Sequence, residues 1–316
     1  MDEYIFLHQQ CPTAATIPTF YQPGFFFNEY AHLQQQAEPF TLVSAVNQKT
    51  RQAEARCAFF SRSDEACSPA AAPFGSIEFS ETLPDKVLAG FLVYLTAAAR
   101  GEGAKKLKIV SYPQCYAPSQ AERLTKALLL DGFTQQSAHP TYYIPIGNQL
   151  FTDQLVPAER RRLRQCQRAG FQVNQWTHTD MAELIHFVEE TRREKGYPLS
   201  LDSSRLMALC KQFPDQFIAF KVTDGSRLAA AAITVRVRHD ILYSFLPASH
   251  PDYRALSPMV MLTDGLFNYC RDRSIRLLDL GVSLDEHKQP KPSLMRFKRN
   301  LGAQESPKQT FEKMLW

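Results

Sequence analysis

Basic residues gather in one short segment near the end of the chain. The segment KPSLMRFKRNLGAQ, Lys291 to Gln304, places Arg296, Lys298 and Arg299 around one aromatic residue and before a Leu-Gly pair. A cation that points inward can hold a phosphate, stabilise an oxyanion or carry a proton, whereas a cation that faces water only solvates a helix. The chemistry of the segment therefore depends on which of the three side chains points inward.

Helical geometry separates these three cations. At about 100° per residue, Leu294, Phe297 and Leu301 form one apolar stripe, which must face the core. Lys298 lies roughly 70° from the centre of that stripe, whereas the two arginines lie roughly 130° or more away. We expect the arginines to face solvent or a polyanion. Lys298 can pack its stem and extend its ammonium group into a cleft, or it can simply reach the surface.

Two further polar residues occur in otherwise apolar strands. Asp279, in LLDLG, ends a strand at the carboxyl edge, where the sites of α/β proteins gather. It could accept or orient the proton of an amine, or it could cap a loop backbone. Tyr243, in ILYSFLP, could act as a general acid if its environment is perturbed, or it could pack in the core.

A basic stripe occurs earlier, in PAERRRLRQCQRAG. Arg161, Arg164 and Arg168 recur at i, i+3 and i+7, so they share one helical face. Such a stripe suits a nucleotide, a tRNA backbone or a phosphorylated substrate, and a solvated helix face is the alternative. Tyr197, in REKGYPLS, follows a helix end and could line a substrate cleft or seal the edge of a core.

Composition excludes several classes of protein. The 316 residues suffice for two domains, and 44% hydrophobic and 22% charged residues are typical of a globular protein. Seven scattered cysteines without a C-x-x-C pair indicate reduced thiols, and neither a signal peptide nor a membrane span is expected, so we predict a cytoplasmic protein. Histidines lack metal-ligand spacing, so no metal is expected, and Walker and Gly-x-Ser-x-Gly motifs are absent.

The elements that must position these residues follow from hydrophobic periodicity. In the first half, helices are predicted at 27–36, 84–103 and 119–133, and strands at 40–46, 55–63, 74–80, 105–113 and 140–146. In the second half, helices are predicted at 157–170, 180–196, 203–213, 257–273 and 291–302, and strands at 171–176, 217–225, 228–240, 241–247 and 275–281. The second half repeats the element order of the first, which indicates an internal duplication.

This repeated order resembles the tandem GNAT-type acyltransferase fold of the FemABX family. RRRLRQCQRAGFQV is similar to the basic helix of that family entering a strand through a glycine. LLDLGVS and LMRFKRNLGA are similar to its Asp-x-Gly strand end and its closing Phe-Lys helix. The resemblance implies an α/β (α+β) fold with mixed central sheets flanked by helices. Residues 1–147 would form a non-catalytic domain that helps bind substrate, and residues 148–316 the catalytic one.

The same resemblance implies chemistry. These families join an acyl group to an amine, with acyl-coenzyme A or aminoacyl-tRNA as the donor. In many GNAT enzymes the closing helix carries Phe-Tyr-x-x-x-Gly, and its tyrosine protonates the leaving thiolate. Here Phe297 to Gly302 keeps the spacing with Lys298 in the place of that tyrosine, where a positive charge suits FemABX-type transfer. Leu128 holds the equivalent place before Gly132 and cannot donate a proton.

The donor site implied by the resemblance is altered. GNAT domains bind pyrophosphate at a helix start resembling Arg/Gln-x-x-Gly-x-Gly/Ala. Here Arg254 keeps the first position, Ser257 would cap the helix with its hydroxyl, and Met259 would crowd a phosphate. The first half has two carboxylates, Glu81 and Asp85, near the corresponding helix start. The alternative is that both segments are merely well-capped helices.

We therefore predict a two-domain N-acyltransferase that transfers an acyl or aminoacyl group to a small-molecule or peptide amine. The acceptor would lie in the cleft between the domains near Asp279 and Lys298, and the donor near Arg254 and Ser257, with Arg296 and Arg299 as further donor contacts. The rival hypothesis is a non-catalytic binding protein that keeps a degenerate GNAT fold.

Overall fold

A computed structural model describes residues 3–36, 39–176, 181–194, 196, 201–285 and 287–315. The chain divides into two compact units: unit 1 comprises Met1–His139 with Ser306–Trp316, and unit 2 comprises Pro140–Glu305. The division therefore falls at 139/140, where 147/148 was expected, and the C-terminal segment joins unit 1. Tyr197, an expected cleft residue, lies outside the described residues.

Unit 1 is built on a mixed sheet. Its strands are β1 (Tyr4–Gln10), β2 (Thr41–Asn47), β3 (Ala53–Arg62), β4 (Glu65–Ser68), β5 (Glu78–Phe79), β6 (Lys106–Val110) and the C-terminal β13 (Gln304–Met314). They are hydrogen-bonded in the order β1-β2-β3-β4-β6-β13, with β5 beside β3. The helices are α1 (Tyr30–Leu33), α2 (Asp85–Gly101) and α3 (Pro118–Leu130), with 3₁₀ turns at Phe26–Asn28, Gln34–Gln36 and Gln114–Tyr116.

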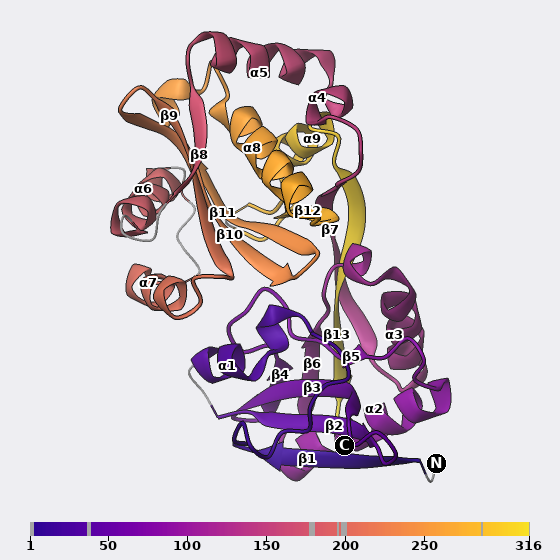
Figure 1. Ribbon diagram of the computed structural model, residues 1–316. Helices are drawn as coiled ribbons and strands as arrows, with labels where there is room; N and C mark the ends of the chain where they lie inside the picture. Colours follow the sequence, from indigo (N-terminus) through magenta and orange to yellow (C-terminus); the bar gives the residue numbers. More distant parts are fainter. Residues whose placement is uncertain are drawn as a thin grey trace. The chain divides into compact units, whose positions relative to one another are not determined.

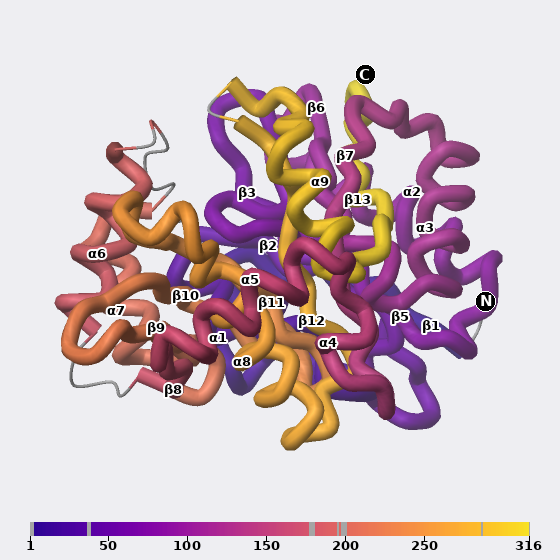
Figure 2. The backbone as a smooth tube through the Cα atoms, turned by 90° about the horizontal axis from the view of Figure 1, so that it is seen from above, coloured from indigo at the N-terminus to yellow at the C-terminus, as the bar shows by residue number. Residues whose placement is uncertain are grey.

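Two helices close the core of unit 1. The apolar face of α2 supplies Leu88, Phe91 and Leu95, which are fully buried against strand residues such as Val43 and Phe59. Helices α2 and α3 lie side by side, as the view from above in Figure 2 shows. Because α2 starts after Pro84 and α3 is followed by Gly132 with a positive φ of 85°, the helix-end signals in the sequence correctly predicted both elements.

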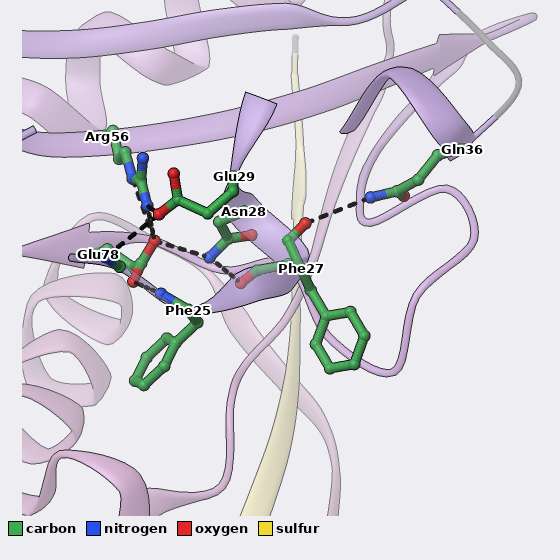
Figure 3. A network of polar contacts seen from close by, with 9 residues as sticks. Phe25, Phe27, Asn28, Glu29, Gln36, Arg56 and Glu78 are labelled. Carbon is green, nitrogen blue, oxygen red and sulfur yellow. Dashed lines mark hydrogen bonds and ion pairs between the residues drawn. The ribbon is translucent and has the colours of Figure 1, made fainter. Parts of the chain in front are cut away.

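A buried polar network fixes the segment that precedes α1. The Glu78 carboxylate accepts hydrogen bonds from the backbone N–H of Phe25 at 2.7 Å, from Asn28 Nδ2 at 3.1 Å and from Arg56 Nη2 at 2.9 Å. Figure 3 shows these side chains converging, with Glu29 also reaching Arg56. Burial lowers the pKa of Arg56, but Glu78 and Glu29 outweigh it and raise that pKa above its ordinary value. The buried Arg56–Glu78 ion pair, with its charge-assisted hydrogen bonds, thus holds the backbone at Phe25 and the side chain of Asn28 in place.

The same network explains why one predicted helix is wrong. Residues 27–36 form two 3₁₀ turns and the single-turn α1 in place of one continuous helix. Glu29 is extended, with φ −75° and ψ 142°, and its carboxylate binds Arg56 and the N–H of Gly24. Side-chain bonds to the backbone and to a buried cation therefore replace the helical ladder at this residue.

Unit 2 is also built on strands of mixed direction. Its strands are hydrogen-bonded in the order β7 (Thr134–Pro145), β12 (Leu277–Val282), β11 (Ile241–Ser249), β10 (Arg227–Arg238), β9 (Phe217–Asp224) and β8 (Gln172–Trp176). Its helices are α4 (Phe151–Gln154), α5 (Pro157–Arg168), α6 (Met181–Glu194), α7 (Ser203–Gln212), α8 (Pro258–Asp272) and α9 (Pro292–Asn300), with a 3₁₀ turn at Pro251–Tyr253.

Helices cover both faces of the strands of unit 2. Figure 1 shows α8 along one face and α6 with α7 on the other. Alternation along β10 agrees, because Ala230 and Ala232 join the core under α8 while Ala231 and Ile233 are equally buried and face the opposite way. A strand buried on both faces reads as a continuous apolar run, which is what LAAAAITV shows.

The expectation of a mixed α/β fold with mixed sheets flanked by helices is confirmed. All five helices predicted in the second half are present, whereas β1, β4, β13 and α4 were not predicted, and the strand expected at 74–80 is confined to Glu78–Phe79. None of the described helices is long and apolar enough to cross a membrane.

Candidate functional site

The site of unit 2 begins where two neighbouring strands separate. Strands β11 and β12 pair in parallel at three positions only, the last of which joins Tyr243 to Asp279. Beyond these residues each strand continues, but no further pairing between them occurs in the described part of the chain. Strand edges that lose their partner leave backbone N–H and C=O groups open to a ligand.

Gly281 shapes the β12 side of this gap. It has a positive φ of 73°, and a Cβ atom at this position would lie 3.1 Å from the Tyr243 ring. The Asp279 carboxylate accepts its backbone N–H at 2.6 Å and the Thr141 hydroxyl at 3.1 Å. Asp279 is 1% exposed, so a buried carboxylate holds the backbone in the bend that the left-handed conformation of Gly281 makes.

Lys298 points into the bend. Among the residues of α9, all of which the structure describes, Lys298 is the buried one, with 7% of its surface exposed. Its Nζ atom donates hydrogen bonds to the carbonyl oxygens of Gly281 at 2.9 Å and Val282 at 2.8 Å. Consecutive carbonyls of a regular strand point to opposite sides, and the left-handed conformation of Gly281 accounts for one amine reaching both. Of the two orientations that the sequence left open for Lys298, the structure therefore has the inward one.

Burial changes the acidity of this amine. Desolvation lowers the pKa of Lys298 from its ordinary 10.5 to about 7, and the negative charge of Asp279 only partly opposes it. Near neutral pH both the ammonium and the amine forms are therefore populated. A group with a pKa near the working pH can both accept and return a proton.

A cavity of about 570 Å³ opens at this point, in the range of small-molecule sites. Its walls are largely apolar and include Phe245, Met259, Leu280, Leu294 and Phe297. Leu294 and Phe297 were expected to face the core, and both form cavity wall, while Phe297 also packs against the core.

The charges that line the cavity have one sign. Arg192, Lys291 and Lys298 belong to the lining, and no aspartate or glutamate does among the residues that the structure describes. A cavity of this kind attracts anions and disfavours a protonated amine. Hydroxyl groups of Thr191, Ser249, Ser257 and Ser293 add neutral hydrogen-bonding capacity.

Tyr243 lines the cavity together with these cations. Its ring packs on Gly281. Burial, reinforced by Asp279, raises the pKa of Tyr243 well above 10, and Arg192 opposes that shift only in part. The phenol therefore stays protonated at neutral pH and can donate a hydrogen bond.

Sequence reasoning missed Arg192. A signal for it exists, because Ile185, Val188 and Arg192 recur at i, i+3 and i+7, which places this cation on the apolar face of α6. Its Nε atom is buried and has no hydrogen-bond partner among the described residues. Burial lowers the pKa of its guanidinium below the ordinary value, although the arginine remains charged.

The expected donor residues lie around the start of α8. Ser257 lines the cavity and Pro258 is the first helical residue, as predicted, but Ser257 adopts a left-handed conformation and its hydroxyl makes no cap. That expectation is wrong, because the Ser257 carbonyl, and not its side chain, accepts the N–H of Val260 at 3.0 Å. Met259 also lines the cavity, and Arg254 is exposed and outside the lining.

The remaining predicted cations face outward. Arg296 and Arg299 are exposed and absent from the cavity lining, and Arg299 pairs with Glu305. Arg161, Arg164 and Arg168 are exposed on α5, away from the cavity lining. The structure thus brings Lys298 and Tyr243 together at the cavity, with Asp279 beneath them, and leaves these arginines on the surface.

The corresponding helix start in unit 1 is occupied by protein. Arg123 donates to the Asp85 carboxylate at 2.7 Å and to the Glu81 carbonyl at 2.8 Å, in front of α2. Leu128 is fully buried in the core of unit 1. In the described part of the chain no group of three or more His, Cys, Asp or Glu side chains is placed to hold a metal ion.

Comparisons with known proteins agree with this architecture. Residues 157–289 match the family model described as acetyltransferase (GNAT) domain. The structure named FemX is similar with a TM-score of 0.69 at 13% identity, over 93% of both chains. A tandem GNAT protein from the clavulanic acid biosynthesis pathway has a TM-score of 0.54 at 10% identity, covering 88% of this chain and 83% of its own.

L-PGS from Bacillus licheniformis has a TM-score of 0.54 at 11% identity, covering 82% of this chain and 80% of its own. No curated protein matches the sequence. At these identities the likeness shows the fold, and what the cavity does must be argued from its own residues.

Proposed function

We propose that the chain is an N-acyltransferase, a proposal that proceeds from the match of residues 157–289 to the acetyltransferase (GNAT) domain model. It moves an acyl or aminoacyl group from acyl-coenzyme A or aminoacyl-tRNA to an amine, and unit 2 carries the reaction. The observation that supports this proposal most directly is the Lys298 amine, buried beside two carbonyl oxygens at the mouth of separated strands.

Lys298 serves as the proton carrier in this scheme. The acceptor nitrogen attacks the acyl carbon, so a C–N bond forms and the carbonyl oxygen becomes an oxyanion. Neutral Lys298 takes the proton that the nitrogen loses, and the resulting ammonium stabilises the adjacent negative charge. When the oxyanion collapses, the bond to the thiolate or ribose oxygen breaks, and the proton passes from Lys298 to that leaving group.

The surrounding residues prepare this step. A cavity with cationic lining lowers the pKa of an amine bound within it, which favours the neutral form that attacks. The Tyr243 phenol, held protonated by burial, is available to donate a hydrogen bond to the oxyanion. Asp279 keeps Gly281 in place and so acts as a positioning residue for Lys298.

Unit 1 has a supporting role in this proposal. Arg123 fills the helix start where a donor phosphate would bind, and Leu128 has no proton to give. We assign unit 1 to substrate binding and not to transfer.

The test is direct measurement of transfer and binding. Purified protein is titrated calorimetrically with acetyl-coenzyme A, coenzyme A and a mixture of aminoacyl-tRNAs, and each donor is then incubated with a panel of amines. Transfer that depends on Lys298 supports the proposal. Binding of a donor without transfer to any amine would favour the rival hypothesis of a degenerate GNAT protein, to which Met259 in the cavity wall gives some support.

A further inference from the structure

A partly buried cation, Arg192, lies in the wall of the cavity. Its Nε atom is buried with no hydrogen-bond partner among the residues that the structure describes. A buried donor on a charged group costs stability when it is left unsatisfied. Such a cost is ordinarily avoided, so a ligand that completes the hydrogen bonds of this guanidinium is the simplest reason for its position.

The position of Arg192 relative to Lys298 follows from contacts. Arg192 and Tyr243 each influence the pKa of the other, Tyr243 packs on Gly281, and the Gly281 carbonyl holds Lys298. Arg192, Tyr243 and Lys298 therefore line the same cavity, with Tyr243 close enough to Arg192 for their charges to interact. A substrate in the cavity can meet Arg192 with one group and Lys298 with another.

We propose that the acceptor carries a carboxylate near its amine, as amino acids and peptide C-termini do, and that Arg192 binds this carboxylate and thereby determines specificity. That the acceptor is an amine rests on the proposed function. That Arg192 binds an anion does not. One guanidinium carries a single positive charge in a planar fork, which matches one planar carboxylate in two parallel hydrogen bonds. No acidic side chain of the described lining competes for it.

Arg193 provides a matched control. It is the next residue of α6, its side chain is 71% exposed, and it pairs with Glu190 at 3.7 Å. Arg193→Gln removes the same charge from the same helix without touching the cavity lining. Lys291→Gln tests the other cation of the lining in parallel.

The binding experiment uses a pair of product-like probes of nearly the same shape, N-acetyl-L-leucine, which ends in a carboxylate, and N-acetyl-L-leucinamide, which ends in a neutral amide. Affinities are measured by NMR titration at pH 8.5, where Lys298 is mostly neutral and contributes little to the preference. Wild type and Arg193→Gln should bind the acid at least about tenfold more tightly than the amide, and Arg192→Gln should lose that preference. The melting temperature of Arg192→Gln should stay level or rise, because the Nε atom that the substitution removes has no partner among the described residues.

Three results would overturn the proposal. Wild type could fail to distinguish acid from amide, or Lys291→Gln and not Arg192→Gln could abolish the preference. Inorganic phosphate or coenzyme A could lose affinity in Arg192→Gln while the acid does not, which would assign Arg192 to the donor. Acid selectivity that depends on Arg192, without transfer from any donor, would instead refute the proposed function and support the anion site.

Discussion

The Nζ atom of Lys298 lies 2.9 Å from the carbonyl oxygen of Gly281, a residue that only a left-handed bend brings into this position. A carbonyl accepts hydrogen bonds and cannot donate them, so this bond and the one to Val282 each use an N–H of the amine. When Lys298 is neutral, its lone pair must therefore point away from both carbonyls. This relationship makes a lysine on a helix of mixed polarity a candidate proton carrier.

Replacement of Lys298 tests that role. Lys298→Met should lower kcat by about 10²- to 10⁴-fold, since a positioned acid–base group contributes that much. Lys298→Arg keeps a charge but cannot release a proton near neutrality, so it should remain strongly impaired. In wild type the rate should rise with pH and level off above about 7, as the amine form becomes dominant. Steady-state rates between pH 5.5 and 9 are the measurement.

Arg296→Gln is the control for that experiment, because Arg296 is exposed on the same helix and outside the cavity lining. It should keep wild-type rates. Full activity of Lys298→Met, with its folding verified by circular dichroism, would remove Lys298 from the mechanism.

The depressed pKa of Lys298 also predicts how stability changes with pH. Between pH 7 and 10.5 the Lys298 amine is protonated in the unfolded state and neutral in the folded state. Because the unfolded state binds more protons, the contribution of Lys298 to the free energy of unfolding rises with pH in this range. Lys298→Met removes that contribution. The melting temperature of wild type relative to Lys298→Met should therefore increase from pH 6.5 to pH 9.5. A constant difference would mean that Lys298 titrates at its ordinary pKa.

Gly281 is expected to tolerate no side chain. Gly281→Ala places a Cβ atom 3.1 Å from Tyr243 at a positive φ, and the left-handed conformation alone costs about 1–2 kcal/mol. Moving the bend also shifts a carbonyl that holds Lys298, so we expect at least about tenfold less transfer as well. Gly225→Ala has the same φ sign with open space around it, so it isolates the backbone cost. Denaturant unfolding and rates are compared, and equal behaviour of the two variants would contradict this account.

The network of unit 1 makes a prediction about stability alone. Glu78→Gln leaves Arg56 without a buried counter-charge, and breaking a buried pair in this way costs about 3–5 kcal/mol. Glu3→Gln removes an exposed partner of Lys49 and should leave the unfolding free energy nearly unchanged. Urea unfolding measures both. If Glu78→Gln loses no more unfolding free energy than Glu3→Gln, the Arg56–Glu78 pair in Figure 3 contributes no more to stability than an exposed ion pair.

The exposed arginines of α5 distinguish the two donors. If aminoacyl-tRNA is the donor, Gln at Arg161, Arg164 and Arg168 should weaken its binding and lower the slope of log affinity against log salt by about two to three. Acetyl-coenzyme A binding should hardly change. Filter binding between 50 and 200 mM salt measures the slope, and an unaltered slope would mark the stripe as a solvated face.

Several features of the fold followed from local pattern. Helices such as α5 and α8 carry their own start and stop signals, and β10 is apolar throughout, so each could be recognised without knowing its neighbours. The short strand β4 could not, because it is stabilised by pairing with β3 and β6 and its own four residues carry little signal. For the same reason the strand expected at 74–80 was predicted longer than β5, which pairs with β3 over two residues. The helix expected at 27–36 failed because Glu29 binds Arg56, which is distant in the chain.

The sequence by itself determined the mixed α/β class and the arginines that face solvent, because helical periodicity fixes which residues share a face. For Lys298 it gave only a place on the flank of the apolar stripe, from which the side chain could reach a cleft or the surface. Only the tertiary structure decided what Lys298 meets, that Asp279 supports a bend, and that Arg192 joins the same cavity. Those facts depend on where β11 and β12 separate and on how α6 and α9 pack around them, and burial there sets the pKa of each group. Desolvation is a property of the assembled surroundings, which no local stretch of sequence encodes.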